Sequence, residues 1–325
     1  MTMLVRRLAQ LALAAAAALA AWSVLETLRA LQPQFPSYPF YTTVYGTLSG
    51  LIFGAFLGCG EAIGTRSAVR VAKCASMGGL LGVIGGGIGF LAALKIVGLV
   101  GAHLVGNPHL IQMVAMPLAG GAGWAVMGAF IGAAARSGSA RGAAVGALGG
   151  LVGALPGGLL VEYEWLWFPS FPFLHLVGLL LFGVSVVLAR ALLEKRFSFG
   201  VLRILGGPLK RREYLLTQGE TVIGASSRCD IVIPFTGEAA AATRDATRPP
   251  VRGYRNIAET HCRIVAKGRD LFIAPLGGDV VVNGTRLDAQ TKGGERESRS
   301  SGTEIFLKFD DVVACGTVCF LYKRG

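Results

Sequence analysis

Side chains with the chemistry to hold a ligand gather in three short segments of the last third of the chain. These candidate partner-binding residues are Ser226, Ser227, Arg228, Thr260, Arg263 and Asn283. Hydroxyl and amide groups supply neutral hydrogen bonds, and a guanidinium can bind a carboxylate or a phosphate through two parallel hydrogen bonds.

The sequence holds no comparable set for catalysis or for a metal ion. Its four histidines are scattered, and its six cysteines include no CxxC pair, so we expect reduced thiols. It has no GxSxG or P-loop motif and no pair of carboxylates that indicates acid–base chemistry. We therefore assign no catalytic, cofactor-binding or metal-binding residue, and we expect a protein that is not an enzyme.

The segments around the candidate residues follow the order of a known framework. Residues 221–234 read as a strand, a glycine, a short loop, Asp-Ile and a second strand, and the later segments are 257–264, 281–287 and 310–316. Together they resemble the forkhead-associated (FHA) domain, a reader of phosphothreonine, over about residues 200–323. Short strands between Gly, Asn and Asp turns independently favour an all-β sandwich.

The resemblance fails where the family binds its phosphothreonine. Ala225 stands in the place of the family's arginine and Ala258 in the place of its serine, and residues 276–279 contain no asparagine but end in an aspartate. Losing the arginine removes a bidentate, charge-assisted contact to phosphate. The resemblance thus implies a domain that folds, with His261 kept in a structural role, but does not read phosphothreonine in the usual way. Hydroxyl and basic groups at 226–228 leave an altered phosphate site open.

The first two thirds of the chain is too apolar for an ordinary soluble protein. A helix needs roughly 20 apolar residues to cross a bilayer, and six segments qualify, at about residues 8–28, 45–64, 76–106, 110–135, 142–161 and 172–193. We predict a polytopic α-helical membrane domain over residues 1–193, a basic connector over 194–212 and an FHA-like β-sandwich over 213–325.

Basic residues fall on one side of these predicted spans. They are Arg6, Arg7, Arg66, Arg70, Lys73, Arg136, Arg141, Arg190, Lys195 and Arg196. The positive-inside rule then predicts a multi-pass protein of a bacterial inner membrane with both termini, and so the C-terminal domain, in the cytoplasm. Arg6-Arg7 before an Ala/Leu run also resembles a secretory signal peptide, whose cleavage would leave five spans.

Glycines recur at four-residue spacing on the predicted spans, as in a glycine zipper. The helix-packing candidates are Gly46, Gly50, Gly54, Gly58, Gly78, Gly82, Gly86, Gly128, Gly132, Gly142, Gly146 and Gly150. This spacing places them on one helix face, where two backbones can approach closely. Packing within the chain is one interpretation, and an oligomeric interface or pore wall is the other. The similar segments 54–58 and 128–132 indicate a repeat of two helical hairpins.

The predicted function follows from this combination. The net charge of +12 is explained by membrane topology rather than by nucleic-acid binding, because the basic residues of the first half lie between apolar segments. We predict a membrane-anchored adapter or scaffold whose FHA-like domain docks a cytoplasmic protein partner or its own copies, independently of phosphothreonine. The alternative is an oligomeric channel or transporter component with this domain as an assembly or gating module.

Overall fold

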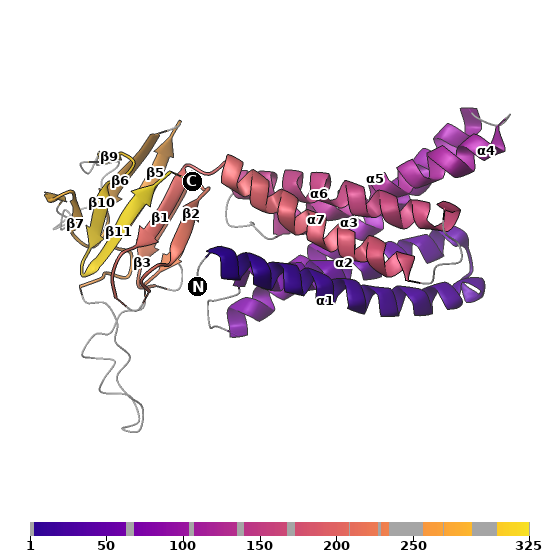
Figure 1. Ribbon diagram of the computed structural model, residues 1–325, viewed down its shortest axis with the longest axis horizontal. Helices are drawn as coiled ribbons and strands as arrows, with labels where there is room; N and C mark the ends of the chain where they lie inside the picture. The colour runs from indigo at the N-terminus through magenta and orange to yellow at the C-terminus, as the bar shows by residue number, and fades with distance from the viewer. Residues whose placement is uncertain are drawn as a thin grey trace, which may run out of the picture. The chain divides into compact units, whose positions relative to one another are not determined.

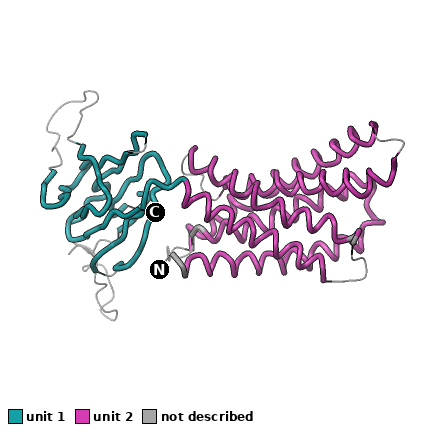
Figure 2. The backbone as a smooth tube through the Cα atoms, turned by 45° about the horizontal axis from the view of Figure 1, so that its top comes forward, with its two compact units in different colours: residues 1–3, 197–325 teal, residues 4–196 magenta. Residues whose placement is uncertain are grey.

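The computed structural model contains two compact units, residues 4–196 and residues 197–325 with 1–3 (Figure 2). The residues that the structure describes are 3–62, 68–103, 107–134, 140–167, 173–207, 209–226, 229–233, 256–268, 270–287 and 304–324.

The first unit is a bundle of long helices (Figure 1). Its elements are α1 (Met3–Ala30), the 3-10 turn η1 (Gln32–Gln34), α2 (Tyr38–Ala62), α3 (Ala68–His103), α4 (Pro108–Leu110), the π-helical turn η2 (Ile111–Ala115), α5 (Met116–Ala134), α6 (Ala140–Trp167) and α7 (Leu174–Arg196). Within the described residues, six helical segments are long and apolar enough to cross a membrane. The predicted helical membrane architecture is confirmed at this level.

Helix α2 begins earlier than its hydropathy suggests. The hydroxyl of Ser37 accepts a hydrogen bond from the Phe40 N–H at 3.4 Å, and the Ser37 carbonyl accepts one from the Tyr41 N–H at 3.1 Å. These bonds satisfy donors that a helix start leaves unpaired. The predicted span began at residue 45 because the tyrosines and threonines of the first two turns lower the hydropathy.

Glycines bring α2 against α3 and α5 against α6 with backbone touching backbone. A Cβ atom added to Gly50 would lie 1.9 Å from the carbonyl oxygen of Gly82, and one added to Gly132 would lie 2.0 Å from that of Gly146. No side chain fits there. Gly46 against Gly86, Gly54 against Gly78, Gly128 against Gly150 and Gly58 against Cys74 repeat the contact, and Gly142 is buried. These rows therefore pack within the chain, in both hairpins.

A second set of contacts closes the bundle around an aromatic centre. Phe53, Trp124 and Phe182 are fully buried, with ring centroids 4.7 Å apart for Phe53 and Phe182 and 5.0 Å apart for Trp124 and Phe182. Both pairs meet edge to face, a favourable arrangement for aromatic rings. Helix α1 adds a face of alanines with no exposed area, namely Ala14, Ala17, Ala18 and Ala21. The alanine run of α1 is thus a packing surface of the bundle.

The second unit is a sandwich of two sheets. Its strands are β1 (Gly200–Ile204), β2 (Glu213–Leu216), β3 (Glu220–Gly224), β4 (Ile231–Val232), β5 (Cys262–Lys267), β6 (Asp270–Pro275), β7 (Val280–Val282), β8 (Thr285–Leu287), β9 (Ile305–Leu307), β10 (Val312–Cys315) and β11 (Val318–Lys323). One sheet has the order β2-β1-β11-β10-β7-β8 and the other β4-β3-β5-β6-β9. Alternating side chains from both sheets form one apolar core.

The predicted connector is too long. Helix α7 continues to Arg196, and β1 already begins at Gly200 and pairs with both β2 and β11. Leu202 and Ile204 alternate into the sandwich core with at most 1% of their surface exposed. The basic residues on either side concealed this short strand, because they dominate the local charge while the alternation spans only five residues.

One substitution pair tests the glycine contacts on a single helix. Gly82→Ala should lower the free energy of unfolding by roughly 1–3 kcal/mol, because the added Cβ meets the Gly50 carbonyl. Gly98→Ala on the same helix meets nothing within 4 Å and should be neutral or slightly stabilising. Thermal unfolding of both variants in detergent would measure the difference. Equal melting temperatures would show that the close approach does not contribute to stability.

Candidate functional site

Three loops of the sandwich meet at His261. One follows β3 at Ala225, one precedes β5 at Ala258, and one joins β6 to β7 over residues 276–279. The Ala225 N–H donates to the Ala258 carbonyl at 3.0 Å, and the Leu276 N–H donates to the His261 carbonyl at 2.9 Å. We call these the His261 loops; they are the segments where the FHA resemblance would place a ligand.

The imidazole of His261 holds two of these loops together. Its Nδ1 accepts a hydrogen bond from the Ala258 N–H at 3.2 Å, so its Nε2 carries the proton and donates to the Asp279 carbonyl at 3.0 Å. The residue is 1% exposed, and a Cβ on Gly278 would lie 2.0 Å from Nδ1. Burial lowers the pKa of His261, against the opposing effect of the Asp279 carbonyl. Its ring is occupied by the protein itself.

Two described backbone donors of the β3 loop are also occupied. The Ser226 N–H donates to the Glu259 carbonyl at 3.0 Å, as the Ala225 N–H does to Ala258. The Cys229 thiol donates to the same Glu259 carbonyl at 3.1 Å. An anion site needs backbone N–H groups that point outward, and these two point into the loop contacts. The hydrogen bonds of this loop therefore attach it to the loop that precedes β5.

Among the described residues of the His261 loops, the side chains are neutral, acidic or apolar. Ala225 and Ala258 are half-buried and carry no donor, whereas Glu259, Thr260 and Leu276 are exposed. Asp279 forms an ion pair with Arg286, a residue that the sequence analysis did not select. The pairing joins the end of the β6–β7 loop to β8, so no local pattern could have revealed it.

The six candidate partner-binding residues do not form one site. Ser226 and Thr260 lie in the His261 loops, while Ser227 and Arg228 are outside the described residues. Arg263 is the second residue of β5 and lies on the outer face of its sheet, 3.8 Å from Glu220 and 3.9 Å from Glu304. Its charge is matched there, away from the loops.

Asn283 has a structural position in the turn between β7 and β8. Its φ of 50° is a left-handed conformation that asparagine tolerates better than most residues. Its Nδ2 donates to Asp311 Oδ1 at 2.7 Å, and its Oδ1 accepts from the Val312 N–H at 2.8 Å. Both ends of the amide are thus used to tie this turn to the start of β10.

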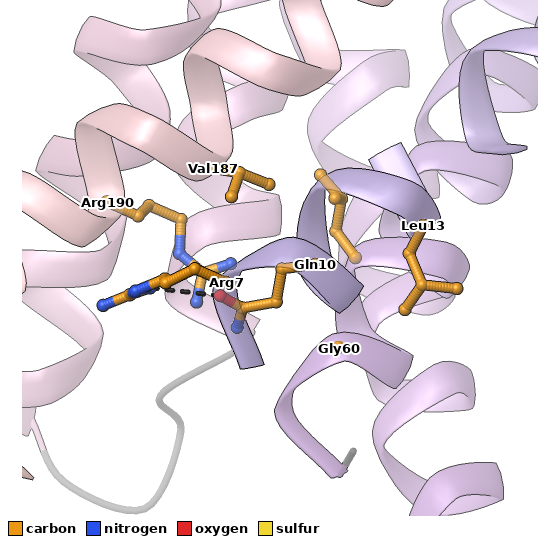
Figure 3. A pocket seen from close by; sticks show the side chains of 7 residues that line it. Arg7, Gln10, Leu13, Gly60, Val187 and Arg190 are labelled. Atoms are coloured by element: carbon orange, nitrogen blue, oxygen red, sulfur yellow. Dashed lines mark hydrogen bonds between the residues drawn. The ribbon is translucent and has the colours of Figure 1, made fainter. Parts of the chain in front are cut away.

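The helical unit carries a polar cluster where α1 begins and α7 ends, which we call the Arg7 end (Figure 3). Arg7 Nη1 donates to Gln10 Oε1 at 3.1 Å, and Arg7 Nη2 donates to Glu194 Oε2 at 3.0 Å. Arg190 Nη2 lies 3.7 Å from the other oxygen of Glu194. The cavity between them measures about 10 Å³, room for about one water molecule. This cluster fastens α1 to α7 and is too small for a ligand.

Acid should loosen the His261 loops. Because the folded-state pKa of His261 lies below its ordinary value of 6.5, the unfolded chain binds the proton more tightly. The stabilisation is complete above about pH 6.5 and is lost as the pH falls through the folded-state pKa. Hydrogen-exchange protection factors of β5 and β6 should therefore fall from about pH 6.5 to pH 5.

In His261→Ala the same amides should be less protected throughout, and this acid-dependent loss should be smaller. His109→Ala, which removes an exposed histidine of the helical unit, should behave as the wild type. An unchanged pH dependence in His261→Ala would contradict the assignment.

No family model matches the chain, and no curated protein matches it. Solved structures that are similar include the FhaA FHA domain complexed with the intracellular domain of Rv3910, at 17% identity and a TM-score of 0.26 over 38% of this chain and 98% of that one. An FHA domain of an Arabidopsis thaliana protein is 20% identical, with a TM-score of 0.26, over 38% of this chain and 83% of that one. Mycobacterium tuberculosis EmbR, in complex with a low-affinity phosphopeptide, is 13% identical, with a TM-score of 0.26, over 88% of this chain and 72% of that one.

The arrangement of the C-terminal unit agrees with the motif order. Residues 221–234 supply β3 and β4, residues 257–264 lead into β5 through His261, and residues 281–287 contain the β7–β8 turn. Two packed sheets with the His261 loops between strand ends complete it. Residues 197–325 have an FHA-like fold.

Proposed function

We propose that the protein is a membrane-anchored scaffold whose FHA-like domain docks a protein partner without reading phosphothreonine. Six long apolar helices supply the anchor. The C-terminal unit supplies a rigid sandwich with a loop surface, a common arrangement for protein recognition.

The observation that supports this proposal is the state of the hydrogen-bond donors at positions 225, 226 and 258 of the His261 loops. Ala225 and Ala258 have no polar side-chain atom, and the N–H groups of Ala225 and Ser226 are bonded to the neighbouring loop. Exposed Glu259 would repel a phosphate. Taking a phosphate from water without such donors costs more than it gains. In their described parts the loops keep the backbone geometry, but they lack the arginine and serine contacts at positions 225 and 258.

The same loops offer a different surface to a partner. Leu276 exposes 42% of its surface, beside exposed Thr260 and Glu259. This combination fits a protein segment with an apolar side chain and a basic or neutral polar group, rather than one with a phosphate. The partner proposed is therefore an unphosphorylated protein segment or a second copy of this chain.

The membrane orientation that we propose places the Arg7 end in the cytoplasm. Arg7, Arg190, Lys195 and Arg196 all belong to that end, and the positive-inside rule puts such residues inside. Because β1 begins directly after α7, the FHA-like unit is then cytoplasmic, at an inner membrane of bacterial type. We propose that α1 is retained, because its buried alanines and the Arg7–Glu194 ion pair are part of the bundle.

A channel or transporter component remains the second candidate. The glycine rows do not support it, since they are filled by helices of the same chain. A cavity lined by Arg29, Glu162 and three tyrosines, at the end of the bundle opposite the Arg7 end, favours it, because ionisable groups between membrane helices usually have a function.

Peptide binding by the full chain in detergent tests the docking proposal. A library of phosphothreonine peptides and its unphosphorylated counterpart should bind equally, because positions 225 and 258 lack the arginine and serine contacts to phosphate. Ala225→Arg combined with Ala258→Ser serves as the matched variant, and it should prefer the phosphorylated library by about tenfold, the value of a regained charged contact. Phosphate-dependent binding by the wild type, lost in Arg228→Ala, would instead indicate an altered phosphate site.

Two reporter fusions test the orientation. A reporter after Gly325 should be active only in its cytoplasmic form, and one inserted between Gln32 and Gln34 only in its periplasmic form, because a single apolar helix separates the cytoplasmic start of α1 from that turn. Activity of both fusions on the same side would exclude retention of α1 as a span. A periplasmic C-terminal fusion would exclude cytoplasmic docking.

A further inference from the structure

The helical unit has a larger cavity at the end of the bundle opposite the Arg7 cluster, where α1 ends and α7 begins; we call it the Arg29 end. The cavity measures about 340 Å³ and is lined by residues of α1, α2, α3, α5 and α6. Pockets that hold small molecules have volumes of about 300–1,000 Å³. Its polar lining includes Arg29, Glu162 and the tyrosines Tyr38, Tyr41 and Tyr45.

A hydrogen-bonded chain fixes the wall of this cavity. Arg29 Nη1 donates to Glu26 Oε1 at 2.9 Å, and Glu26 Oε1 also accepts from His175 Nδ1 at 2.7 Å. The Tyr45 hydroxyl lies 2.9 Å from His175 Nε2. With Nδ1–H donating to a carboxylate, Nε2 is free to accept from the tyrosine, so this pairing suits a neutral imidazole.

Acidic charge exceeds basic charge around this cavity. Glu26 and Glu164 both contact Arg29, at 2.9 Å and 3.5 Å, and Glu162 lines the cavity as a third carboxylate. Among the described residues of this group, one guanidinium thus faces three carboxylates. Carboxylates between helices need a compensating partner, because burial removes the water that stabilises their charge. A bound cation would supply such a partner.

Two carboxylate oxygens have no partner in the described part of the chain. Glu164 is 5% exposed, and its Oε2 is buried without a hydrogen bond. Glu162 Oε1 accepts from Trp124 Nε1 at 3.0 Å, and no described group donates to its Oε2. Gly120 makes room for this carboxylate, since a Cβ there would lie 2.3 Å from its Cδ. The bundle thus positions Glu162 at the cavity and leaves one oxygen available.

The remaining lining suits an organic cation rather than a metal ion. Phe90 lies beside Tyr45 at a centroid distance of 5.8 Å, and Tyr41 follows at 6.1 Å from Tyr45. Aromatic faces attract cations within about 6 Å of the ring centre. Leu94, Val97, Met116, Val161 and Leu166 form an apolar wall. A small hydrated ion gains nothing from such a wall, whereas an apolar body does.

An irregular helical turn contributes to one wall of the cavity, near its entrance. Gln32, Tyr38 and Gln112 are exposed lining residues and mark the open side of the cavity. Gln112 lies in the π-helical turn Ile111–Ala115, which ends two residues before Pro117. Pro117 cannot donate an N–H to the preceding turn. Such π-helical turns are frequent at functional sites. Here the turn places Gln112, Met116 and Pro117 on the cavity.

We propose that the cavity at the Arg29 end binds an organic cation of single positive charge with an apolar, aromatic body, and that Glu162 is its counterion. The tyrosines and Phe90 surround the charge, and the apolar wall holds the body. This binding function is separate from docking by the FHA-like domain and makes the membrane unit a receptor or carrier for such cations.

Two probe ions of the same shape and opposite charge test this proposal. Binding of radiolabelled tetraphenylphosphonium and of tetraphenylborate to the full chain in detergent would be measured by equilibrium dialysis. We expect saturable binding of the phosphonium, weakened about tenfold or more in Glu162→Gln, because that change removes the charge partner. Glu194→Gln, the same change at the Arg7 end, should leave phosphonium binding unchanged. Binding of the borate should not depend on Glu162.

A second variant pair keeps the proposal testable if Glu162→Gln does not fold. Val97→Trp should fill the cavity while every charge is kept, and so abolish phosphonium binding; Leu99→Trp, at a position 66% exposed on the same helix, should not. Absence of saturable phosphonium binding, or equal binding of both ions with no effect of Glu162→Gln and Val97→Trp, would overturn the proposal.

Discussion

Direct backbone contact between helices is the constraint on which the membrane unit depends. Lipid tails are as apolar as leucine, so hiding leucine side chains between helices gains little. Close approach instead gains van der Waals and Cα–H···O contacts. Gly50 against Gly82 and Gly132 against Gly146 supply this approach in both hairpins. These hairpins position Trp124 of α5 and Phe53 of α2 in the aromatic centre, and α7 adds Phe182.

The two ends of the bundle differ in how their buried charged side chains are paired and in the size of the cavity between them. At the Arg7 end, arginines from α1 and α7 share Glu194, and the cluster closes to a cavity of about 10 Å³. At the Arg29 end, carboxylates outnumber the guanidinium in the described group, and the cavity measures about 340 Å³. Closing that end would press unmatched carboxylates together. The open cavity and the unmatched charge are thus two aspects of one arrangement.

In the FHA-like unit, the groups that shape the loops differ from those that would bind phosphate. His261 and Gly278 determine the loop geometry through the backbone, whereas the family's ligand contacts come from side chains. Alanine at 225 and 258 removes donors without disturbing a backbone hydrogen bond, since the N–H of Ala225 still reaches the Ala258 carbonyl at 3.0 Å. The loop geometry therefore does not depend on the side chains at positions 225 and 258.

The sequence by itself determined the features that a few neighbouring residues encode. Hydropathy over one helix length predicted the six spans, four-residue spacing predicted the glycine faces, and Ala225 and Ala258 predicted the loss of phosphate contacts. Only the tertiary structure decided which side chains meet. It joined Glu26 to His175 and Trp124 to Glu162 across different helices, and it separated Arg263 and Asn283 from the His261 loops. The reason is physical: these contacts join residues far apart in the chain, and no local periodicity records which faces come together.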